Sequence, residues 1–168
     1  APFKPRGTDI SVILDLMIHD IDIILSLVRA PTTRIDANGV AVLSDEIDIV
    51  NARLQFETGC VANVTASRVS MKTERKMRFF EHDAYVSVDF HNRSMTIHRK
   101  GEGEMYPGVP NIDTREETFG QDDALRAEID AFLDAIGSGT PPLVSGEDGR
   151  RALEVAFRIS DLIRHPGG

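Results

Sequence analysis

The chain has 168 residues, of which 41% are hydrophobic and 27% charged, so its apolar content is too high for a disordered chain. Its net charge of −8 argues against a general nucleic-acid-binding protein, because neutralising phosphates requires a basic surface. The single cysteine, Cys60, excludes an internal disulfide and is compatible with a reducing compartment, and we expect a cytoplasmic protein.

The first ten residues hold two prolines and a glycine, which is typical of an extended segment. A helix is predicted from about Ser11 to Val28, and Pro31 ends it. The helix is nearly long and apolar enough to span a bilayer, but it contains three aspartates and a histidine. Each aspartate at mid-membrane costs about 2.5–3.5 kcal/mol, so we expect no transmembrane helix.

From about residue 33 to residue 119 the apolar residues recur at every second position. The pattern at 52–56, repeated at 62–66 after the turn at Glu57–Gly59, predicts a β-hairpin. Further strands are predicted near residues 77–79, 86–90, 95–97 and 114–119, and the short loops between them indicate an antiparallel meander. The segment Gly101–Asp113 has three glycines, two prolines and no periodicity, which predicts a long loop.

Two helices are predicted to close the chain. Asp122 or Asp123 caps the first, which runs to about Ile136 and is ended by Gly137 and Gly139. The second begins at Ser145 and places five residues on one face: Leu153, Ala156, Phe157, Ser160 and Ile163.

The segregation of helices and strands predicts an α+β fold, an open, mostly antiparallel β-sheet with helices packed on one face. There is no parallel βαβ unit and no Gly-rich phosphate loop, so we expect no Rossmann domain in this chain. The other face of the sheet is predicted to mix polar and aromatic residues, and it is either solvated or an interface: Arg53, Gln55, Asn63, Thr65, Ser67, Tyr85 and Ser87.

The first helix carries a single polar stripe. At about 100° per residue, five short polar side chains fall within a band about 80° wide. The stripe is either the solvent-exposed side of a largely buried helix or a functional surface, because it lacks the long charged residues usual on solvent faces. It consists of Ser11, Asp15, His19, Asp22 and Ser26.

Asp15 and His19 are four residues apart, so their side chains can meet on a helix. A carboxylate beside an imidazole fixes its tautomer and raises its basicity, which makes a proton-transfer unit. The pair supplies neither a nucleophile nor an electrophile, so it is not a complete catalytic site.

The segment Leu14–Asp22, Leu-Asp-Leu-Met-Ile-His-Asp-Ile-Asp, resembles the helix motif of the Gfo/Idh/MocA oxidoreductases, relatives of glucose–fructose oxidoreductase and inositol dehydrogenase. Asn51–Ser70 also looks like the first hairpin of that family. In the family an N-terminal Rossmann domain binds NAD or NADP, and a C-terminal α+β domain supplies the substrate site. The resemblance implies that His19 removes the proton of a substrate hydroxyl as hydride leaves for the nicotinamide, while Asp15 orients His19.

The chain departs from the family in lacking the Gly-rich loop and the Glu-Lys-Pro lysine of the Rossmann domain, and in having Ser11-Val12 where many members place glycines. We therefore expect residues 1–168 to be one substrate, catalytic and dimerisation domain of a longer two-domain enzyme, inactive and without cofactor on its own. The resemblance implies a sugar, nucleotide-sugar or cyclitol substrate, with nucleotide sugars favoured. The mixed face of the sheet and the resemblance together predict a homodimer or tetramer formed through that face. The acidic net charge and the aspartates of the first helix lead us to expect no nucleic-acid or membrane partner.

Other residues are weaker candidates. Asp22 and Arg68 are further candidates for substrate contact, although a surface or interface role is the more ordinary one for Arg68. The spacing of His82, His91 and His98 demands no metal site, and we expect none. Cys60 is expected to be a small buried or half-buried thiol rather than a nucleophile.

Two functions from different classes remain open at this point. One is the substrate-binding and catalytic domain of an NAD(P)-dependent oxidoreductase, which requires Asp15 and His19 to face an open cleft. The alternative is a non-catalytic β-sheet module for dimerisation or ligand binding, in which the stripe faces solvent or an interface.

Overall fold

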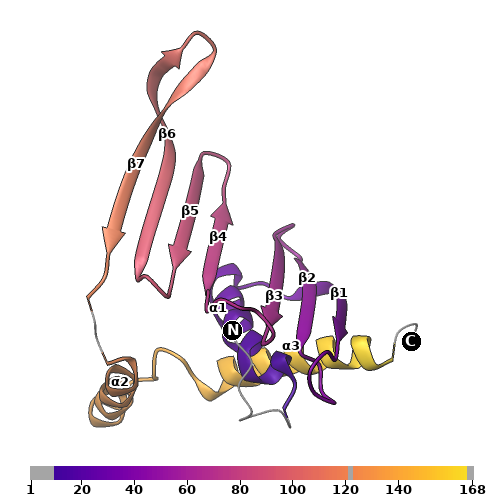
Figure 1. Ribbon diagram of the computed structural model, residues 1–168. Helices are drawn as coiled ribbons and strands as arrows, with labels where there is room; N and C mark the ends of the chain where they lie inside the picture. The colour runs from indigo at the N-terminus through magenta and orange to yellow at the C-terminus, as the bar shows by residue number, and fades with distance from the viewer. Residues whose placement is uncertain (1–9, 121–122, 166–168) are drawn as a thin grey trace. The chain divides into compact units, whose positions relative to one another are not determined.

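The computed structural model describes residues 10–120 and 123–165 (Figure 1). The chain divides into two compact units: unit 1 comprises Ala1–Met71 and Asp130–Gly168, and unit 2 comprises Lys72–Ile129. The strands form two antiparallel sheets, one in each unit, instead of the single sheet that the strand pattern suggested. The expected class is confirmed, because open antiparallel sheets are combined with separate helices.

Unit 1 joins a three-stranded sheet to two helical segments. The chain enters through one turn of π-helix, and the strands follow in the order β1-β2-β3. The β2–β3 hairpin predicted from the sequence is confirmed. The elements are η1 (Ile13–Met17), α1 (Ile18–Val28), β1 (Thr32–Val40), β2 (Ile49–Phe56), β3 (Val61–Ser67) and α3 (Gly146–Arg164).

The core of unit 1 lies between the sheet and the helices. Every second residue of β2 is buried, as expected for a strand with one covered face, while Asn51 and Arg53 are exposed. The helix α3 packs against η1, α1 and β1, and α1 and α3 lie beside the three strands in Figure 1. The buried apolar residues of β2 and the helices are Val50, Ala52, Leu54, Phe56, Val12, Ile13, Met17, Ile21, Ile24, Ala152, Val155, Ala156 and Ile159.

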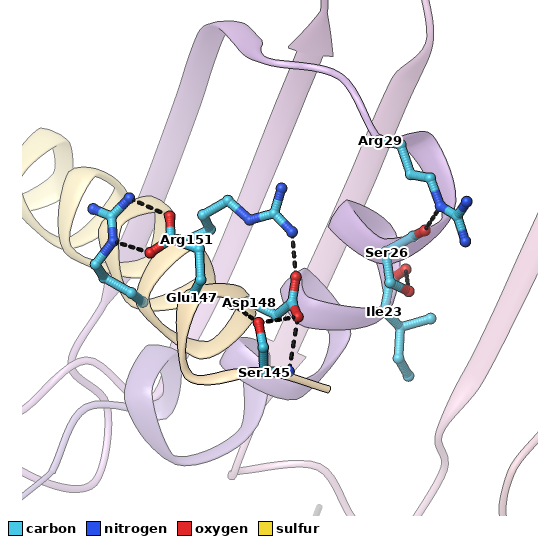
Figure 2. A network of polar contacts seen from close by, with 8 residues as sticks. Ile23, Ser26, Arg29, Ser145, Glu147, Asp148 and Arg151 are labelled. Atoms are coloured by element: carbon cyan, nitrogen blue, oxygen red, sulfur yellow. Dashed lines mark hydrogen bonds and ion pairs between the residues drawn. The ribbon is translucent and has the colours of Figure 1, made fainter. Parts of the chain in front are cut away.

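The start of α3 agrees with the prediction, but its buried face differs. Ser145 forms a capping box with Asp148, shown in Figure 2, and this satisfies backbone groups at the helix N-terminus. Leu153 and Phe157, which were expected on the inner face, are 41% and 53% exposed. Ala156 and Ser160 are buried as expected, and the other buried residues of α3 are Ala152, Val155 and Ile159.

Unit 2 is a four-stranded antiparallel meander in the order β4-β5-β6-β7. Every residue that the structure describes in this unit is at least partly exposed, so the sheet is held by its ladder and by cross-strand contacts such as the stacking of Tyr85 on His98. The strands are β4 (Lys76–Phe80), β5 (Ala84–Asp89), β6 (Ser94–Tyr106) and β7 (Val109–Thr118).

The prediction of a long loop at Gly101–Asp113 is wrong. Most of this segment extends β6 and β7 into a long hairpin that turns at Gly108, whose φ is 80°. The pairing register shifts twice, between Lys100 and Glu104 and again before Tyr106. Each irregularity breaks the two-residue alternation, so the pattern of this hairpin is hidden in the sequence.

The helix α2 (Ala124–Ser138) crosses the boundary between the units. Asp123 caps it as predicted, with its carboxylate accepting the Arg126 N–H at 3.2 Å, while Asp122 and the first nine residues lie outside the described part. Gly139 follows with a left-handed φ of 66°. None of the described helices is long and apolar enough to cross a membrane.

Close packing makes Gly39 of β1 sensitive to substitution. A Cβ there would lie 3.0 Å from Ile47 Cγ2 and from the Ile49 carbonyl oxygen, and 3.1 Å from Ile163 Cδ1. We expect Gly39→Ala to lower the free energy of unfolding by about 1–3 kcal/mol, because backbone and α3 must both move. Urea unfolding measures this change.

The matched control is Gly149→Ala in α3, where an added Cβ meets no atom within 4 Å. It should raise the free energy of unfolding by about 0.5–1 kcal/mol, through helix propensity. A neutral or stabilising Gly39→Ala would contradict the close approach of β1 and α3.

Candidate functional site

Asp15 and His19 are exposed side chains on the otherwise largely buried first helical segment. Asp15 belongs to η1 and His19 to the first turn of α1. Within the described part of the chain neither side chain forms a hydrogen bond or ion pair, with the other or with a third residue. Both groups are therefore available to a ligand.

The polar stripe differs from its prediction at its N-terminal end and at Asp22. Ser11 is only 4% exposed, so it is part of the interior and not of the surface stripe. Asp22 is half-buried. Ser26 is exposed, but its hydroxyl donates to the Ile23 carbonyl at 2.8 Å, as Figure 2 shows. Asp15, His19 and Asp22 remain the residues with side chains suited to chemistry.

The π-helical turn explains this difference. The uniform rotation of an α-helix does not apply across Ile13–Met17, where the repeat is wider. The Ser11 carbonyl accepts the N–H groups of both Leu14 and Asp15, each at 3.1 Å, which fixes where the turn begins. Single π-helical turns occur frequently at functional sites, and this one carries Asp15.

The start of the helical segment is bonded, on both sides of Ser11, to residues next to the ends of β2 and β3. The Val12 N–H donates to the Ile47 carbonyl at 2.9 Å. The guanidinium of Arg68 donates to the Ile10 carbonyl, and its Nε lies 3.6 Å from Asp48 Oδ1. Arg68 is only 6% exposed, so the prediction that it lies on the surface is wrong.

Asp48, which the sequence analysis did not single out, is fully buried. Its Oδ2 accepts the N–H groups of Val42, Leu43 and Ser44 at 2.8, 2.6 and 2.9 Å, and its Oδ1 accepts the Ser44 hydroxyl at 2.8 Å. Burial raises the pKa of this carboxyl group, but these hydrogen bonds outweigh it and lower the pKa of Asp48 to about 2. The sequence feature that could have identified this buried carboxylate is an aspartate inside the apolar run Ile47–Val50.

The other sequence candidates lie elsewhere. His82 and His91 are exposed in unit 2, and His98 Nδ1 is 2.9 Å from Thr114 Oγ1. Residues 10–120 and 123–165 bring no three His, Cys, Asp or Glu side chains together in a way that could hold a metal. Cys60 is exposed, contrary to the expectation of a buried or half-buried thiol.

The predicted mixed face is divided between the two sheets. On unit 1 the outward side chains pair across strands: Arg53 Nη1 donates to Asn63 Oδ1 at 3.1 Å, and Thr65 Oγ1 to Asn51 Oδ1 at 2.7 Å. Tyr85 and Ser87 belong to β5 of unit 2, so they do not continue that sheet. A shallow polar hollow in unit 2 contains none of the predicted site residues: it is lined by Lys72, Thr73, Glu74, Lys76, Asp89, His91 and Asn92.

Comparison with known families decides the class. The family model for the GFO/IDH/MocA C-terminal domain matches residues 3–87. The chain belongs to this family. The resemblance seen in the helix motif and first hairpin is thereby confirmed, and both segments fall inside the matched region.

Similar proteins support the same family. The chain is 43% identical over 159 residues to a UDP-N-acetylglucosamine 3-dehydrogenase from Acidithiobacillus ferrooxidans, covering 95% of this chain and 50% of the relative. It is 24% identical to a myo-inositol 2-dehydrogenase from Thermotoga maritima, covering 87% and 45%. A solved structure of the A. ferrooxidans enzyme superposes with a TM-score of 0.89 at 42% identity, over 97% of this chain and 52% of that one. The chain thus spans about half the length of these relatives.

The buried carboxylate predicts a pH dependence of stability. The pKa of Asp48 is about 2 in the folded chain against 3.8 ordinarily, so the folded state binds this proton less readily than the unfolded state. The group therefore contributes about 2 kcal/mol above pH 4, and this contribution is lost as the pH falls through 2.

Urea unfolding of the wild type and Asp48→Asn between pH 6 and pH 2 isolates this contribution. The difference in the free energy of unfolding between the two proteins should shrink as the pH falls from 4 to 2. A difference that stays constant over that range would show that the carboxylate is not stabilised in the folded chain.

Proposed function

We propose that this chain is the substrate-binding and catalytic domain of an NAD(P)-dependent dehydrogenase that acts on a hydroxyl or carbonyl of a sugar, nucleotide sugar or cyclitol. The observation that carries the proposal is the pair Asp15 and His19. Both are exposed and have no partner among residues 10–120 and 123–165, and the helical segment that carries them is bonded to residues next to the ends of β2 and β3. The dehydrogenase names of the similar proteins support the reaction class.

The proposed chemistry divides the work between the two side chains. His19 accepts the proton of the substrate hydroxyl as the carbonyl forms, since a neutral imidazole nitrogen can act as a general base. Asp15 makes no hydrogen bond with His19 in the structure, and we propose that it pairs with the imidazole as that ring takes up the proton, which orients the ring and balances its charge. Asp22, half-buried in the following turn, is proposed to bind a substrate hydroxyl.

The described residues do not fit a dinucleotide site. Both sheets are entirely antiparallel, and no Gly-rich loop joins a strand to a helix N-terminus in the part of the chain that the structure covers. NAD(P), when bound, would accept the hydride. We propose that its site lies in the half of a longer protein that the similar dehydrogenases have and this chain does not span.

Among possible substrates, we propose a nucleotide sugar. The similarity to the UDP-N-acetylglucosamine 3-dehydrogenase is 43%, against 24% for the myo-inositol 2-dehydrogenase over a comparable span. UDP-N-acetylglucosamine is therefore the first substrate to test, with myo-inositol as the competing one.

The decisive variant is His19→Ala in the full-length enzyme. Removing a general base costs about 10²–10⁴-fold in rate, so kcat for NADH formation from UDP-N-acetylglucosamine should fall by that order. Asp15→Asn should lower kcat less, because it disturbs only the orientation and charge balance of the imidazole. The melting temperature should be unchanged, because both side chains are exposed.

His165→Ala, which removes an exposed imidazole at the end of α3, is the matched control and should retain wild-type kcat. If His19→Ala keeps the wild-type kcat, the stripe is only the solvent face of the helix. If no dinucleotide-dependent activity is found with either substrate, the proposed reaction class is wrong.

The sheet is proposed to serve assembly as well. The outward face of β2 and β3 carries side chains already ordered by cross-strand hydrogen bonds, which suits a two-fold contact between identical polar surfaces. We therefore propose a homodimer, or a tetramer built from such dimers. This contact is also what the alternative, non-catalytic module would require.

Light scattering at tens of micromolar should give the mass of a dimer or tetramer. The charge-introducing pair Asn63→Lys and Thr65→Lys should lower that mass at unchanged melting temperature, because both side chains are exposed. A monomeric wild type, or an assembly unaffected by the two lysines, would exclude this face.

A further inference from the structure

We infer that Arg68, held in place by Asp48, is a positioning residue for the proposed catalytic pair. The inference rests on the function proposed above for Asp15 and His19. We infer this role instead of the predicted substrate contact, because the Arg68 guanidinium is buried against groups of the protein.

Arg68 is held against Asp48 by both its backbone and its side chain. It follows directly on β3, and its backbone N–H donates to the Asp48 carbonyl at 3.0 Å. Its side chain lies beside the same residue's carboxylate, with 3.6 Å between Nε and Oδ1. A buried guanidinium needs such a counter-charge, so the two residues form one unit.

Asp48 is held by the loop that precedes it in the chain. The N–H groups of Val42, Leu43 and Ser44 converge on Oδ2, and the Ser44 hydroxyl occupies Oδ1. These donors fix the carboxylate independently of Arg68. Asp48 is therefore a rigid reference point from which the guanidinium is oriented.

Backbone hydrogen bonds connect Arg68 and Asp48 to the proposed site. Three consecutive residues at the start of the helical segment are each bonded: the Ile10 carbonyl to Arg68, the Ser11 carbonyl to the Asp15 N–H, and the Val12 N–H to the Ile47 carbonyl. Ile47 immediately precedes Asp48. A shift of Ile10 therefore moves the backbone that sets the position of Asp15, and with it the turn that leads to His19.

A merely structural role for Arg68 predicts a different result from a positioning role. Loss of a structural contact lowers stability and acts independently of the catalytic side chains. Loss of a positioning contact acts through those side chains, so its effect on kcat disappears when the imidazole is already absent. A double-mutant cycle between Arg68 and His19 separates the two roles.

The experiment uses the full-length enzyme with Arg68→Lys, His19→Ala and both together, assayed well below each melting temperature. Lysine keeps the charge beside Asp48 but lacks the planar fork of donors. We expect Arg68→Lys to lower kcat by about 10–100-fold, with KM changed less than about 3-fold, since small misplacements of catalytic groups cost rates of this order. In the His19→Ala background the same substitution should lower kcat by less than about 2-fold.

Phe56→Leu is the matched control, because Phe56 is equally buried but lies at the far end of β2 from Asp48. It should lower the melting temperature and leave kcat unchanged. Ser44→Ala, which removes one hydrogen bond to Asp48 and keeps the ion pair, provides a second variant in case Arg68→Lys does not fold. It should lower kcat by about 2–10-fold, again only when His19 is present.

The outcomes distinguish the two proposals. An equal loss of kcat from the Arg68 or Ser44 substitution in both backgrounds, or a loss of melting temperature with unchanged kcat, overturns the positioning role while the function of His19 stands. A His19→Ala enzyme with full activity overturns the proposed function, and the positioning role falls with it.

Discussion

The buried ion pair between Asp48 and Arg68 is the constraint on which the arrangement of unit 1 depends. Burying two charges is costly, and here the cost is offset by four hydrogen bonds to the carboxylate and by the Ile10 carbonyl at the guanidinium. Asp48 directly precedes β2 and Arg68 directly follows β3, so the pair connects the ends of these two strands to the start of the first helical segment. Without this ion pair, the backbone before η1 would lose the hydrogen bond between the Ile10 carbonyl and the Arg68 guanidinium.

The same arrangement explains why Asp15 and His19 are exposed on so apolar a segment. Val12, Ile13, Met17 and Ile21 face α3 and the sheet, and burial of these side chains fixes the rotation of the segment. The opposite side of the segment, which carries Asp15 and His19, is then exposed to solvent. Unit 2 is organised differently, because no described residue in it is fully buried and its strands depend on ladder hydrogen bonds and cross-strand pairs.

Much of the fold could be predicted because it is encoded locally. The β2–β3 hairpin shows strict alternation around a short turn, and Ser145 and Asp123 are recognisable helix caps. The extended ends of β6 and β7 could not be predicted, because register shifts at Lys100 and Glu104 interrupt the alternation. Leu153 and Phe157 were misplaced because helical spacing fits two adjacent faces of α3, and only packing selects one.

The sequence by itself determined the α+β class, the family motif in Leu14–Asp22 and the residues suited to proton transfer, because each depends on neighbours along the chain. The tertiary structure decided which polar residues of the first helix are accessible, since a π-helical turn and the burial of Ser11 shift the stripe. It also decided the role of Asp48 and Arg68. The Arg68 guanidinium and the Ile10 carbonyl are 58 positions apart and meet only in the folded chain, so no local pattern records their contact. The N–H donors of Val42–Ser44 are close to Asp48 in the sequence, but the shape of that loop is not visible in any periodic pattern.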